Sequence, residues 1–429
     1  MNILMLTNTY APHVGGVARS VESFTAEYRR RGHRVLVVAP EFENIPAHET
    51  DVVRIPAIQH FNGSDFSVPV PIPGYLSSTL AEFQPTVVHA HHPFLLGDAA
   101  LRIAAGFCIP VVFTHHTRYD QYTHYVPGDS ALLRRFAVEL AAGYANLCDA
   151  VIAPSQSIAR LLRAEGVQSP IEVIPTGVDV ARFGHGNGRA ARDACGIPPA
   201  AFVVGHVGRL AAEKNLPFLA HAVASFLRQC SRAHFVIAGT GPAQAEVERI
   251  IAEAGVASRC HMVGVLMHQD LVDAYHGCDV FAFASQSETQ GMVLTEAMAA
   301  GVPVVAVDAP GVREVVEDRC NGRLLDREDP REFAAALAWV ADLNDAQRAQ
   351  VRARALATAE RFSLSYTAAQ ALRLYEALCQ KGPANKTAGD GLWATAIRRF
   401  QEEWRIWSNV AGALGTALIS DAPPEQSAP

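Results

Sequence analysis

The sequence predicts an α/β protein with two domains, each built around a parallel β-sheet. The chain has 429 residues, which is longer than a single hydrophobic core usually serves. In both halves, short continuous apolar runs alternate with helical patterns, which is typical of βαβ units whose sheet is covered on both faces. The alternation weakens once, at 182–199, where glycine, proline and charged residues gather. That stretch is therefore expected to be a linker.

The first domain is expected to span residues 1–185. A helical pattern at 17–31 ends at Gly32, a residue type that favours a helix C-cap. The expected strands are 3–7, 35–39, 86–90, 110–114, 150–153 and 171–174.

The second domain is expected to span residues 200–362, with a terminal helix at 363–380 that packs back towards the first domain. Its expected strands are 202–208, 234–239, 280–284 and 302–307, with a short one at 323–325. A polar break at 381–391 precedes an extension, 385–429, which is expected to be helical over 392–420 and disordered at 421–429.

Composition narrows the class of protein. The formal net charge is −7, which argues against a general nucleic-acid binder. The eight cysteines form no C-x-x-C pair and are expected to be reduced thiols rather than ligands of a zinc ion. The N-terminus lacks the basic region of a signal peptide, and no apolar run is long enough to span a bilayer. We expect a cytoplasmic protein, with any membrane contact peripheral at the inner face of the cytoplasmic membrane.

Three segments that follow expected strands have residues suited to binding phosphates and sugars. Gly15 and Gly16 lie between the first strand and the first helix, where the backbone can approach a ligand closely and helix N–H groups are exposed. The loop is neither a Walker A loop nor a G-x-G-x-x-G fingerprint, and a purely structural turn explains it equally.

Arg209 and Lys214 follow the strand 202–208. Ligands of open α/β sheets bind beyond the carboxyl ends of strands, and two cations there can neutralise a diphosphate. Solvated surface cations are the alternative.

Glu288 and Glu296 follow the strand 280–284 with the spacing E-x7-E. Gly291 is expected to start a helix that contains Glu296 and ends at Gly301. Each carboxylate can accept hydrogen bonds from two neighbouring hydroxyls, as sugars and ribose present, and the amides of 289–293 can meet phosphate oxygens. An ordinary helix start with an acidic first turn is the alternative.

Taken together, and in this order, the three segments resemble the retaining glycosyltransferases of the group 4 type. These have the GT-B fold, in which two Rossmann-like domains face across a cleft. The resemblance covers about residues 1–380. It implies that the second domain holds a nucleotide-sugar, with Glu288 on the sugar hydroxyls, Glu296 on the ribose, and Arg209 and Lys214 on the diphosphate. The donor-binding residues it implies are Gly15, Gly16, Arg209, Lys214, Leu266, Glu288, Thr289, Gln290, Gly291, Met292, Val293 and Glu296.

The resemblance also assigns a histidine of the first domain to the transferred sugar. This is His116, and the catalytic residues implied are His116, Arg209, Lys214 and Glu288. His89, His91 and His92 cluster nearby in the sequence and could suggest a metal, but the family generally needs none, so pocket lining or structural hydrogen bonds are expected instead. No cofactor is expected, since the nucleotide-sugar is a co-substrate. Arg209 and Lys214 would stabilise the leaving diphosphate, and the family's usual front-face mechanism predicts retention of configuration.

The acceptor is expected to bind the first domain. The run 113–128 resembles that of bacterial glycosyltransferases that place glucose on diacylglycerol, and Arg134 and Arg135 in an apolar helix, with Arg29, Arg30, Arg31 and Arg34, would suit an anionic membrane. Core packing with solvated arginines explains each segment equally. In the extension, Trp393, Trp404 and Trp407 fall on one helical stripe, which fits either the bilayer interface or docking onto a protein surface.

We therefore expect transfer of a hexose, glucose from UDP-glucose, to a lipid acceptor such as diacylglycerol. A mannosyl- or other hexosyltransferase in polysaccharide or glycan-precursor assembly is the alternative. From other classes, a non-catalytic scaffold is disfavoured by the intact set of site residues, and no feature supports the pyridoxal cofactor of a related phosphorylase.

Overall fold

The protein divides into two compact units in the computed structural model. One comprises Met1–Pro175 and Ala368–Pro429, the other Thr176–Thr367. The structure describes residues 1–13, 15–46, 48–59, 67–70, 74–119, 131–382 and 392–419. The expected disordered end at 421–429 and part of the polar break at 381–391 lie outside the described residues. All eight cysteines are free thiols.

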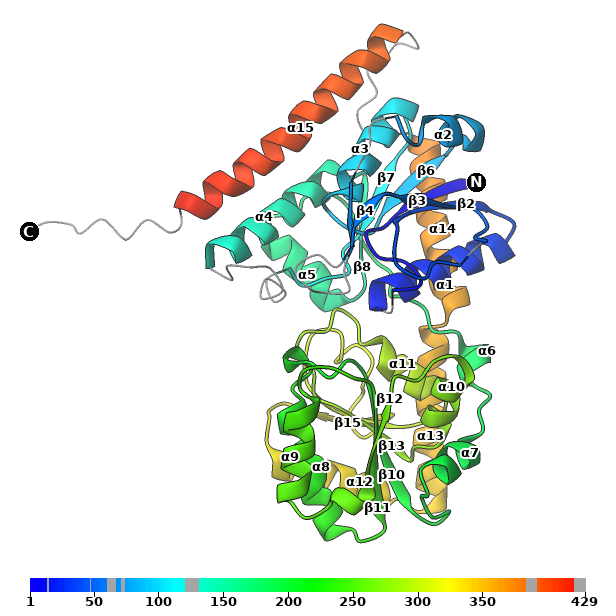
Figure 1. Cartoon of the computed structure of the whole chain (residues 1–429), viewed down its shortest axis with the longest axis vertical. Helices are drawn as coiled ribbons and strands as arrows, with labels where there is room; N and C mark the ends of the chain where they lie inside the picture. The colour runs from blue at the N-terminus through cyan, green and yellow to red at the C-terminus, as the bar shows by residue number, and fades with distance from the viewer. Residues whose placement is uncertain are drawn as a thin grey trace, which may run out of the picture. The chain divides into compact units, whose positions relative to one another are not determined.

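The first unit is built on a seven-stranded parallel sheet with the order β3-β2-β1-β6-β7-β8-β9 (Figure 1). Its strands are β1 (Asn2–Leu6), β2 (Arg34–Pro40), β3 (Val52–Ile55), β6 (Val87–Ala90), β7 (Val111–Thr114), β8 (Ala150–Ala153) and β9 (Ile171–Val173), and a small antiparallel pair is formed by β4 (Ala57–Ile58) and β5 (Val68–Pro69). Its helices are α1 (Gly16–Arg30), α2 (Ser77–Phe83), α3 (Leu96–Phe107), α4 (Ala131–Leu147), α5 (Gln156–Ala164), most of α14 (Leu364–Lys381) and α15 (Leu392–Ile419).

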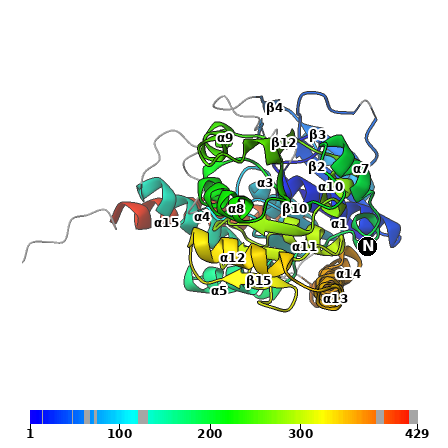
Figure 2. The same cartoon turned by 90° about the horizontal axis from the view of Figure 1, so that it is seen from below.

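The second unit is built on a six-stranded parallel sheet with the order β12-β11-β10-β13-β14-β15. Its strands are β10 (Phe202–Val207), β11 (Ala233–Ala238), β12 (Cys260–Gly264), β13 (Val280–Phe283), β14 (Val304–Val307) and β15 (Gly322–Leu325). Its helices are α6 (Val180–Phe183), α7 (Gly188–Ala194), α8 (Leu216–Gln229), α9 (Gln244–Glu253), α10 (His268–His276), α11 (Met292–Ala299), α12 (Pro330–Ala341) and α13 (Asp345–Arg361). Helices α8, α9 and α12 lie on one face of the sheet, and α10, α11 and α13 lie on the other (Figures 1 and 2). Each group of helices contributes side chains to the core on its own face.

Both sheets have the strand order of a Rossmann fold, with the chain reversing its direction of progress once. The reversal lies between β1 and β6 in the first unit and between β10 and β13 in the second. Ligands of such sheets bind beyond the carboxyl ends of the strands at this switch point. The loops after β1, β6, β10 and β13 are therefore where a site is expected.

The expected strands are all present within one or two residues of their predicted ends. The helix caps at Gly32 and Gly301 are confirmed, with backbone φ of 84° and 76°. The structure adds β3 and β12, which the sequence analysis did not predict. Both have half-buried positions and lie at sheet edges, so their apolar pattern is weaker than that of central strands.

The expectation that 182–199 is a linker is wrong. The helices α6 and α7 begin in or near this stretch, because Asp179 accepts a hydrogen bond from the Arg182 N–H at 3.0 Å and Asn187 accepts one from the Ala190 N–H at 3.1 Å. The Asn187 N–H also donates to Asp273 of α10 at 2.7 Å. The glycine and charge content that resembled a linker therefore reflects short capped helices held on the second unit.

The chain enters the second unit at Thr176, ahead of the predicted boundary at 185. The backbone N–H of Thr176 donates to Gln290 Oε1 at 2.5 Å, and its carbonyl accepts from Gln290 Nε2 at 2.6 Å. The Val178 N–H donates to the Phe362 carbonyl at 2.9 Å. These bonds attach the segment after Pro175 to the second unit.

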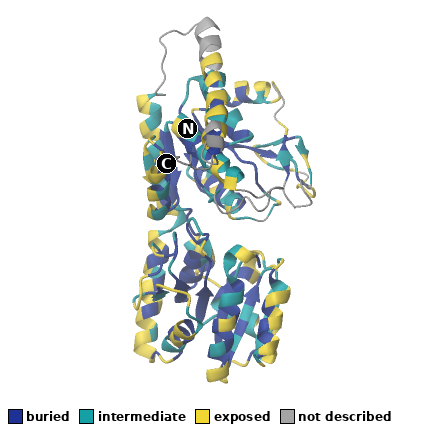
Figure 3. Ribbon diagram, turned by 90° about the vertical axis from the view of Figure 1, so that its left-hand side faces the viewer, coloured by how far each residue is buried: buried dark blue, intermediate teal, exposed yellow. Residues whose placement is uncertain are grey.

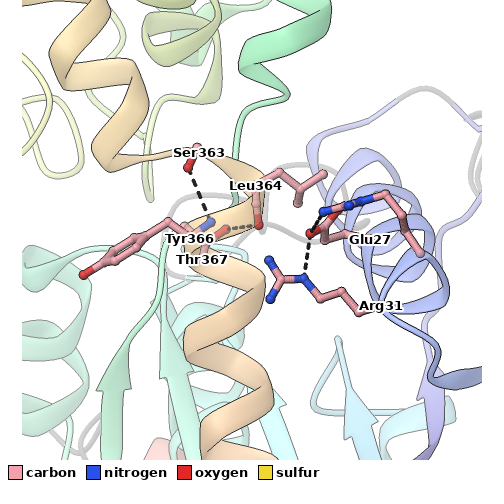
Figure 4. Close-up of polar contacts among 7 residues, drawn as sticks. Glu27, Arg31, Ser363, Leu364, Tyr366 and Thr367 are labelled. Atoms are coloured by element: carbon pink, nitrogen blue, oxygen red, sulfur yellow. Dashed lines mark hydrogen bonds and ion pairs between the residues drawn. The ribbon is translucent and has the colours of Figure 1, made fainter.

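Helix α14 begins in the second unit and continues in the first. At its start, Ser363 Oγ accepts from the Tyr366 N–H at 3.4 Å and Thr367 Oγ1 donates to the Leu364 carbonyl at 3.3 Å (Figure 4). In the first unit, the Tyr375 hydroxyl lies 2.6 Å from His89 Nδ1 and 3.3 Å from the Tyr28 hydroxyl. A buried aromatic and hydrogen-bonded contact therefore fixes the second half of α14.

Candidate active site

In the second unit, the loops after β10 and β13 are joined at the switch point. Ser285 Oγ and Ser287 Oγ, which follow β13, donate to the carbonyl of Glu213 in the loop after β10, at 3.2 and 3.4 Å. Next to this junction, Lys214 Nζ lies 2.5 Å from Glu288 Oε1. Two of the predicted site residues, from distant parts of the sequence, thus form a partly buried ion pair where a ligand is expected.

The loop that carries Arg209 and Lys214 is held by the loop after β11. The Leu210 N–H donates to the Thr240 carbonyl at 2.9 Å, and the Ala243 N–H donates to the Leu210 carbonyl at 2.8 Å. A Cβ on Gly239 would lie 1.9 Å from the Gly208 carbonyl oxygen, and Gly239 has a φ of +135°. The sequence analysis gave this glycine no role, although Gly239 ends a predicted strand and Gly241 follows that strand closely. Arg209 itself is exposed at the start of the loop.

Glu296 is buried within α11, as predicted, at 4% exposure. Its Oε2 accepts a hydrogen bond from the Tyr275 hydroxyl at 2.7 Å. Gly291 has a φ of 74° and immediately precedes the helix, so it starts α11 as expected. The tyrosine orients the carboxylate and was not identified from the sequence, since no local pattern links positions 275 and 296.

Gln290 has a structural role that the sequence analysis did not foresee. Its side-chain amide forms both bonds to Thr176 described above and is buried at 3% exposure. A contact of Gln290 with a donor would therefore come from its backbone. Gly311, in the loop after β14, lies directly beneath this backbone: a Cβ there would be 2.7 Å from the Gln290 nitrogen. Gly311 was also missed.

The other donor-binding residues predicted in this unit lie at the same edge of the sheet. Thr289, Met292 and Val293 are half-buried in the loop after β13 and the first turn of α11. Leu266 follows β12 and is partly buried against the core on the α10 and α11 face. Their roles toward a donor stay predictions.

Beneath the ion pair, His206 of β10 is buried and uncharged at neutral pH. Its pKa is lowered to about 4, chiefly by burial and also by the Lys214 charge. The hydrogen bond from its Nδ1 to the Ala282 carbonyl and the Glu288 charge act in the opposite sense. That bond is 3.0 Å long. The imidazole is stacked on Phe281 at 6.1 Å between ring centroids. The floor of the site is therefore apolar and neutral.

In the first unit, the loops after β1 and β6 are also joined at the switch point. The Asn8 N–H donates to His92 Nδ1 at 3.0 Å, and the Asn8 side chain donates to the Phe94 carbonyl at 3.1 Å. Gly15 and Gly16 follow at the start of α1. A Cβ on Gly16 would meet nothing within 4 Å, so packing within the protein does not explain this glycine, and its predicted role in approaching the donor stays open.

The histidines of the first unit form short contacts with neighbouring polar side chains. His116 Nε2 lies 2.9 Å from His91 Nδ1, and His89 Nε2 lies 2.6 Å from Thr114 Oγ1. Burial, together with the neighbouring histidines, lowers the pKa of His116 well below 6.5. Over the ranges that the structure describes, no three His, Cys, Asp or Glu side chains are arranged to hold a metal ion. The rest of the predicted acceptor run, 120–128, lies outside the described residues.

The basic residues at the end of α1 are held by internal contacts. Arg31 Nε lies 2.7 Å from Glu27 Oε1 (Figure 4). Arg30 Nη2 lies 2.7 Å from the same oxygen. Arg29 donates to the Val35 carbonyl at 2.9 Å, and Arg34 stacks over the Phe83 ring at 5.2 Å. These contacts fit the alternative of a core-packed helix with solvated arginines, since Arg30 and Arg34 are exposed. A role at a membrane surface stays a prediction.

Comparison with known proteins supports the class that the fold and site indicate. Residues 14–182 match the model of Glycosyltransferase Family 4, and residues 189–357 match that of Glycosyl transferases group 1. An alpha-monoglucosyldiacylglycerol synthase of Acholeplasma laidlawii is 30% identical over 77% of this chain and 86% of its own. A GDP-mannose-dependent alpha-mannosyltransferase of Corynebacterium glutamicum is 30% identical over 80% of this chain and 81% of its own. The crystal structure of HepE from Anabaena with UDP aligns with a TM-score of 0.70 and 23% identity, over 88% of this chain and 100% of that one.

Two Rossmann-type sheets, one of which has a Lys–Glu ion pair at its switch point, together with these relatives, indicate a glycosyltransferase of the GT-B fold. The chain belongs to the glycosyltransferases of the group 4 type.

Proposed function

We propose that this glycosyltransferase moves glucose from UDP-glucose to a lipid acceptor such as diacylglycerol, with retention of configuration. The observation that carries the proposal is the Lys214–Glu288 pair at the switch point of the second unit. It puts a cation for the diphosphate beside a carboxylate for the sugar hydroxyls. The named activity of the Acholeplasma laidlawii relative supports the choice of sugar and acceptor.

Each site residue has a task in the proposed reaction. Arg209 and Lys214 take the charge that develops on the leaving diphosphate, a task that a metal ion performs in other transferases, so we propose that no metal is needed. Glu288 accepts from the sugar hydroxyls and Glu296 from the ribose diol. Neutral His116 can accept a hydrogen bond from the transferred sugar without placing a second positive charge beside the developing oxocarbenium ion.

We propose that Lys214 and Glu288 are bonded to each other before the donor binds and to the donor afterwards. Without a donor, Lys214 and Glu288 neutralise each other. A bound donor would offer phosphate oxygens to Lys214 and hydroxyls to Glu288, so that both side chains exchange one partner for another. The site would then be held in place before the donor arrives, which limits the entropy lost on binding.

A second candidate is a mannosyltransferase that uses GDP-mannose in glycan assembly. The Corynebacterium glutamicum relative favours it at equal identity. The proposed roles of Arg209, Lys214, Glu288 and Glu296 concern the diphosphate, the sugar hydroxyls and the ribose, which both donors contain, so the two candidates share one site.

Nucleotide release separates the candidates. The full-length protein is incubated with UDP-glucose, UDP-galactose or GDP-mannose, with and without vesicles containing diacylglycerol, and Glu288→Ala is the control. Vesicle-dependent UDP release with a glucolipid product, absent in the variant, is expected, and NMR of the product should show the α-anomer. Release from GDP-mannose alone would favour the second candidate. Donor binding without turnover on diacylglycerol would overturn the lipid assignment.

A further inference from the structure

Helix α15 lies outside the matched family regions and has two different faces. One face packs against α4 and α3 in the first unit. On it, Arg102 of α3 forms two bonds to Glu403, at 2.5 and 3.1 Å, and Asn409 donates to the Leu140 carbonyl of α4 at 3.2 Å. Ile406 is buried in the core of the first unit. Docking onto the protein, one of the two alternatives from the sequence, therefore holds for this face.

The opposite face carries a stripe of exposed apolar side chains. Figure 3 shows by colour which parts of the ribbon are exposed. Phe400, Trp404, Trp407 and Leu414 are 72%, 69%, 65% and 49% exposed. Their spacing of four, three and seven residues places them in one line along the helix. At a rise of 1.5 Å per residue, this line is about 21 Å long. Exposed aromatic rings in a row are unusual on a protein surface that meets only water.

We propose that this stripe inserts into the interfacial region of an anionic lipid bilayer. Membrane binding by the stripe does not depend on the proposed function, but its biological purpose rests on that function. Because α15 is fixed to the unit expected to bind the acceptor, the stripe would hold that unit at the surface that contains a lipid acceptor. Tryptophan is the side chain that most favours the membrane–water interface, because its ring is apolar and its N–H is polar. Among the described residues, no helix is long and apolar enough to cross the bilayer, so contact through this stripe would be along the surface.

Charge favours an anionic lipid surface. The chain as a whole carries −7, yet α4 and α15 together contain five arginines and three glutamates. Glu402 and Glu403 are each bonded to an arginine, Arg405 and Arg102. Arg134 and Arg135 of α4 are exposed. By sequence, the helix pair therefore carries a net charge of +2. Positive charge together with an apolar stripe is the combination that binds anionic membranes.

The size of the stripe disfavours a second copy of the chain as its partner. With about 150–250 Å² for each aromatic side chain, the exposed area of the four residues is about 500 Å². A stable protein interface buries about 800 Å² on each partner and is broader than one row of side chains. A row of this width suits insertion between lipid headgroups better.

Vesicle binding tests the proposal independently of glycosyl transfer. The full chain is sedimented with vesicles of phosphatidylglycerol and phosphatidylcholine that lack diacylglycerol, and with vesicles of phosphatidylcholine alone. Binding to the anionic vesicles is expected, with quenching of tryptophan emission by brominated lipid. In W404S/W407S the partition constant should fall by at least about 10-fold, whereas Tyr366→Ser, which removes an exposed aromatic from α14, should bind like the wild type.

Three results would overturn the proposal. The first is that the wild type does not bind anionic vesicles, and the second is that W404S/W407S binds them as strongly as the wild type. The third is that W404S/W407S converts a dimer to a monomer while vesicle binding is unchanged, which would assign the stripe to a second copy. A transfer assay with detergent-dispersed diacylglycerol keeps the two hypotheses apart. W404S/W407S should be active in this detergent assay. If the wild type binds vesicles but forms no glucolipid, the membrane role of the stripe is supported and the proposed function is rejected.

Discussion

Lys214 Nζ lies 2.5 Å from Glu288 Oε1 although the two residues are carried by loops that follow different strands. Each residue neutralises the other in the absence of a donor, so removing either one changes what the remaining charge can bind. We therefore predict different effects of the two single variants on the affinity for UDP, which has phosphates but no transferred sugar.

Lys214→Met should weaken UDP binding about 10-fold or more, because a hydrogen bond to a charged group contributes about 1.5–3 kcal/mol. Glu288→Gln should leave UDP affinity unchanged or tighter, since it frees Lys214 for the phosphates. Both should lower transfer about 10²–10³-fold. Titration calorimetry measures the affinities, with Arg249→Ala, an exposed cation on α9, as control. Equal weakening of UDP binding by both variants would contradict the assigned roles.

Gly311→Ala should reduce transfer by displacing the Thr289–Gln290 backbone. The added Cβ would lie 2.7 Å from the Gln290 nitrogen, and the residue has a φ of +79°. We expect a loss of stability of about 1–3 kcal/mol and a fall of kcat/KM beyond about 10-fold. Gly196→Ala is the matched control, because Gly196 has a φ of +65° and open space around it. If both variants transfer at the wild-type rate, Gly311 does not position the loop.

Tyr275→Phe should affect both stability and nucleotide binding. Removal of the hydroxyl deprives the buried Glu296 carboxylate of a 2.7 Å hydrogen bond, at a cost of about 1–3 kcal/mol. The carboxylate also loses its orientation, so UDP should bind several-fold more weakly. Tyr144→Phe, which removes a buried hydroxyl bonded to the Gly97 carbonyl, should destabilise the protein without changing UDP affinity. Unchanged UDP affinity in Tyr275→Phe would separate Glu296 from the donor.

The buried histidines of the first unit make stability fall as the pH falls below about 6.5. Burial lowers the pKa of His89 and of His92 to about 3, so between about pH 6.5 and 3 the unfolded chain binds protons that the folded chain does not. Each such histidine should remove about 1 kcal/mol of unfolding free energy between pH 7.5 and 5.5. Urea unfolding at the two pH values measures this, and His89→Gln should show a difference smaller by that amount. An unaltered pH difference would mean that His89 is protonated in the folded state.

Docking of α15 can be tested at Gly143 of α4. A Cβ at this position would lie 1.7 Å from Asn409 Oδ1, so Gly143→Leu should separate the two helices. Hydrogen exchange of α15 should then become faster while that of α13 stays slow. Gly412→Leu, where a Cβ would meet nothing within 4 Å, is the control. Equal exchange in the wild type and Gly143→Leu would show that α15 is not held by this contact.

The sequence predicted the central strands of both sheets because these are continuous apolar runs. Lys214 and Glu288 were singled out because the order of the motifs resembles that of a family, and the structure brings the two side chains together; their roles toward a donor stay predictions. Tyr275, Gly239 and Gly311 were missed because their roles depend on contacts between segments that are far apart in the sequence. The stretch 182–199 was misread because polar residues that cap short helices have the same composition as a linker. The two faces of α15 could not be separated, since apolar residues fall on both.

The hydrogen bonds between Gln290 and Thr176 also limit which substitutions can change the donor specificity of this enzyme. A substitution at 290 would break two buried hydrogen bonds, so most changes there would be lost through misfolding before any gain in selectivity could be tested. Under the proposed donor site, we expect variation that alters the accepted sugar at the neighbouring half-buried positions Thr289, Met292 and Val293 instead. Libraries intended to alter the donor preference should keep Gln290 fixed and randomise these three positions.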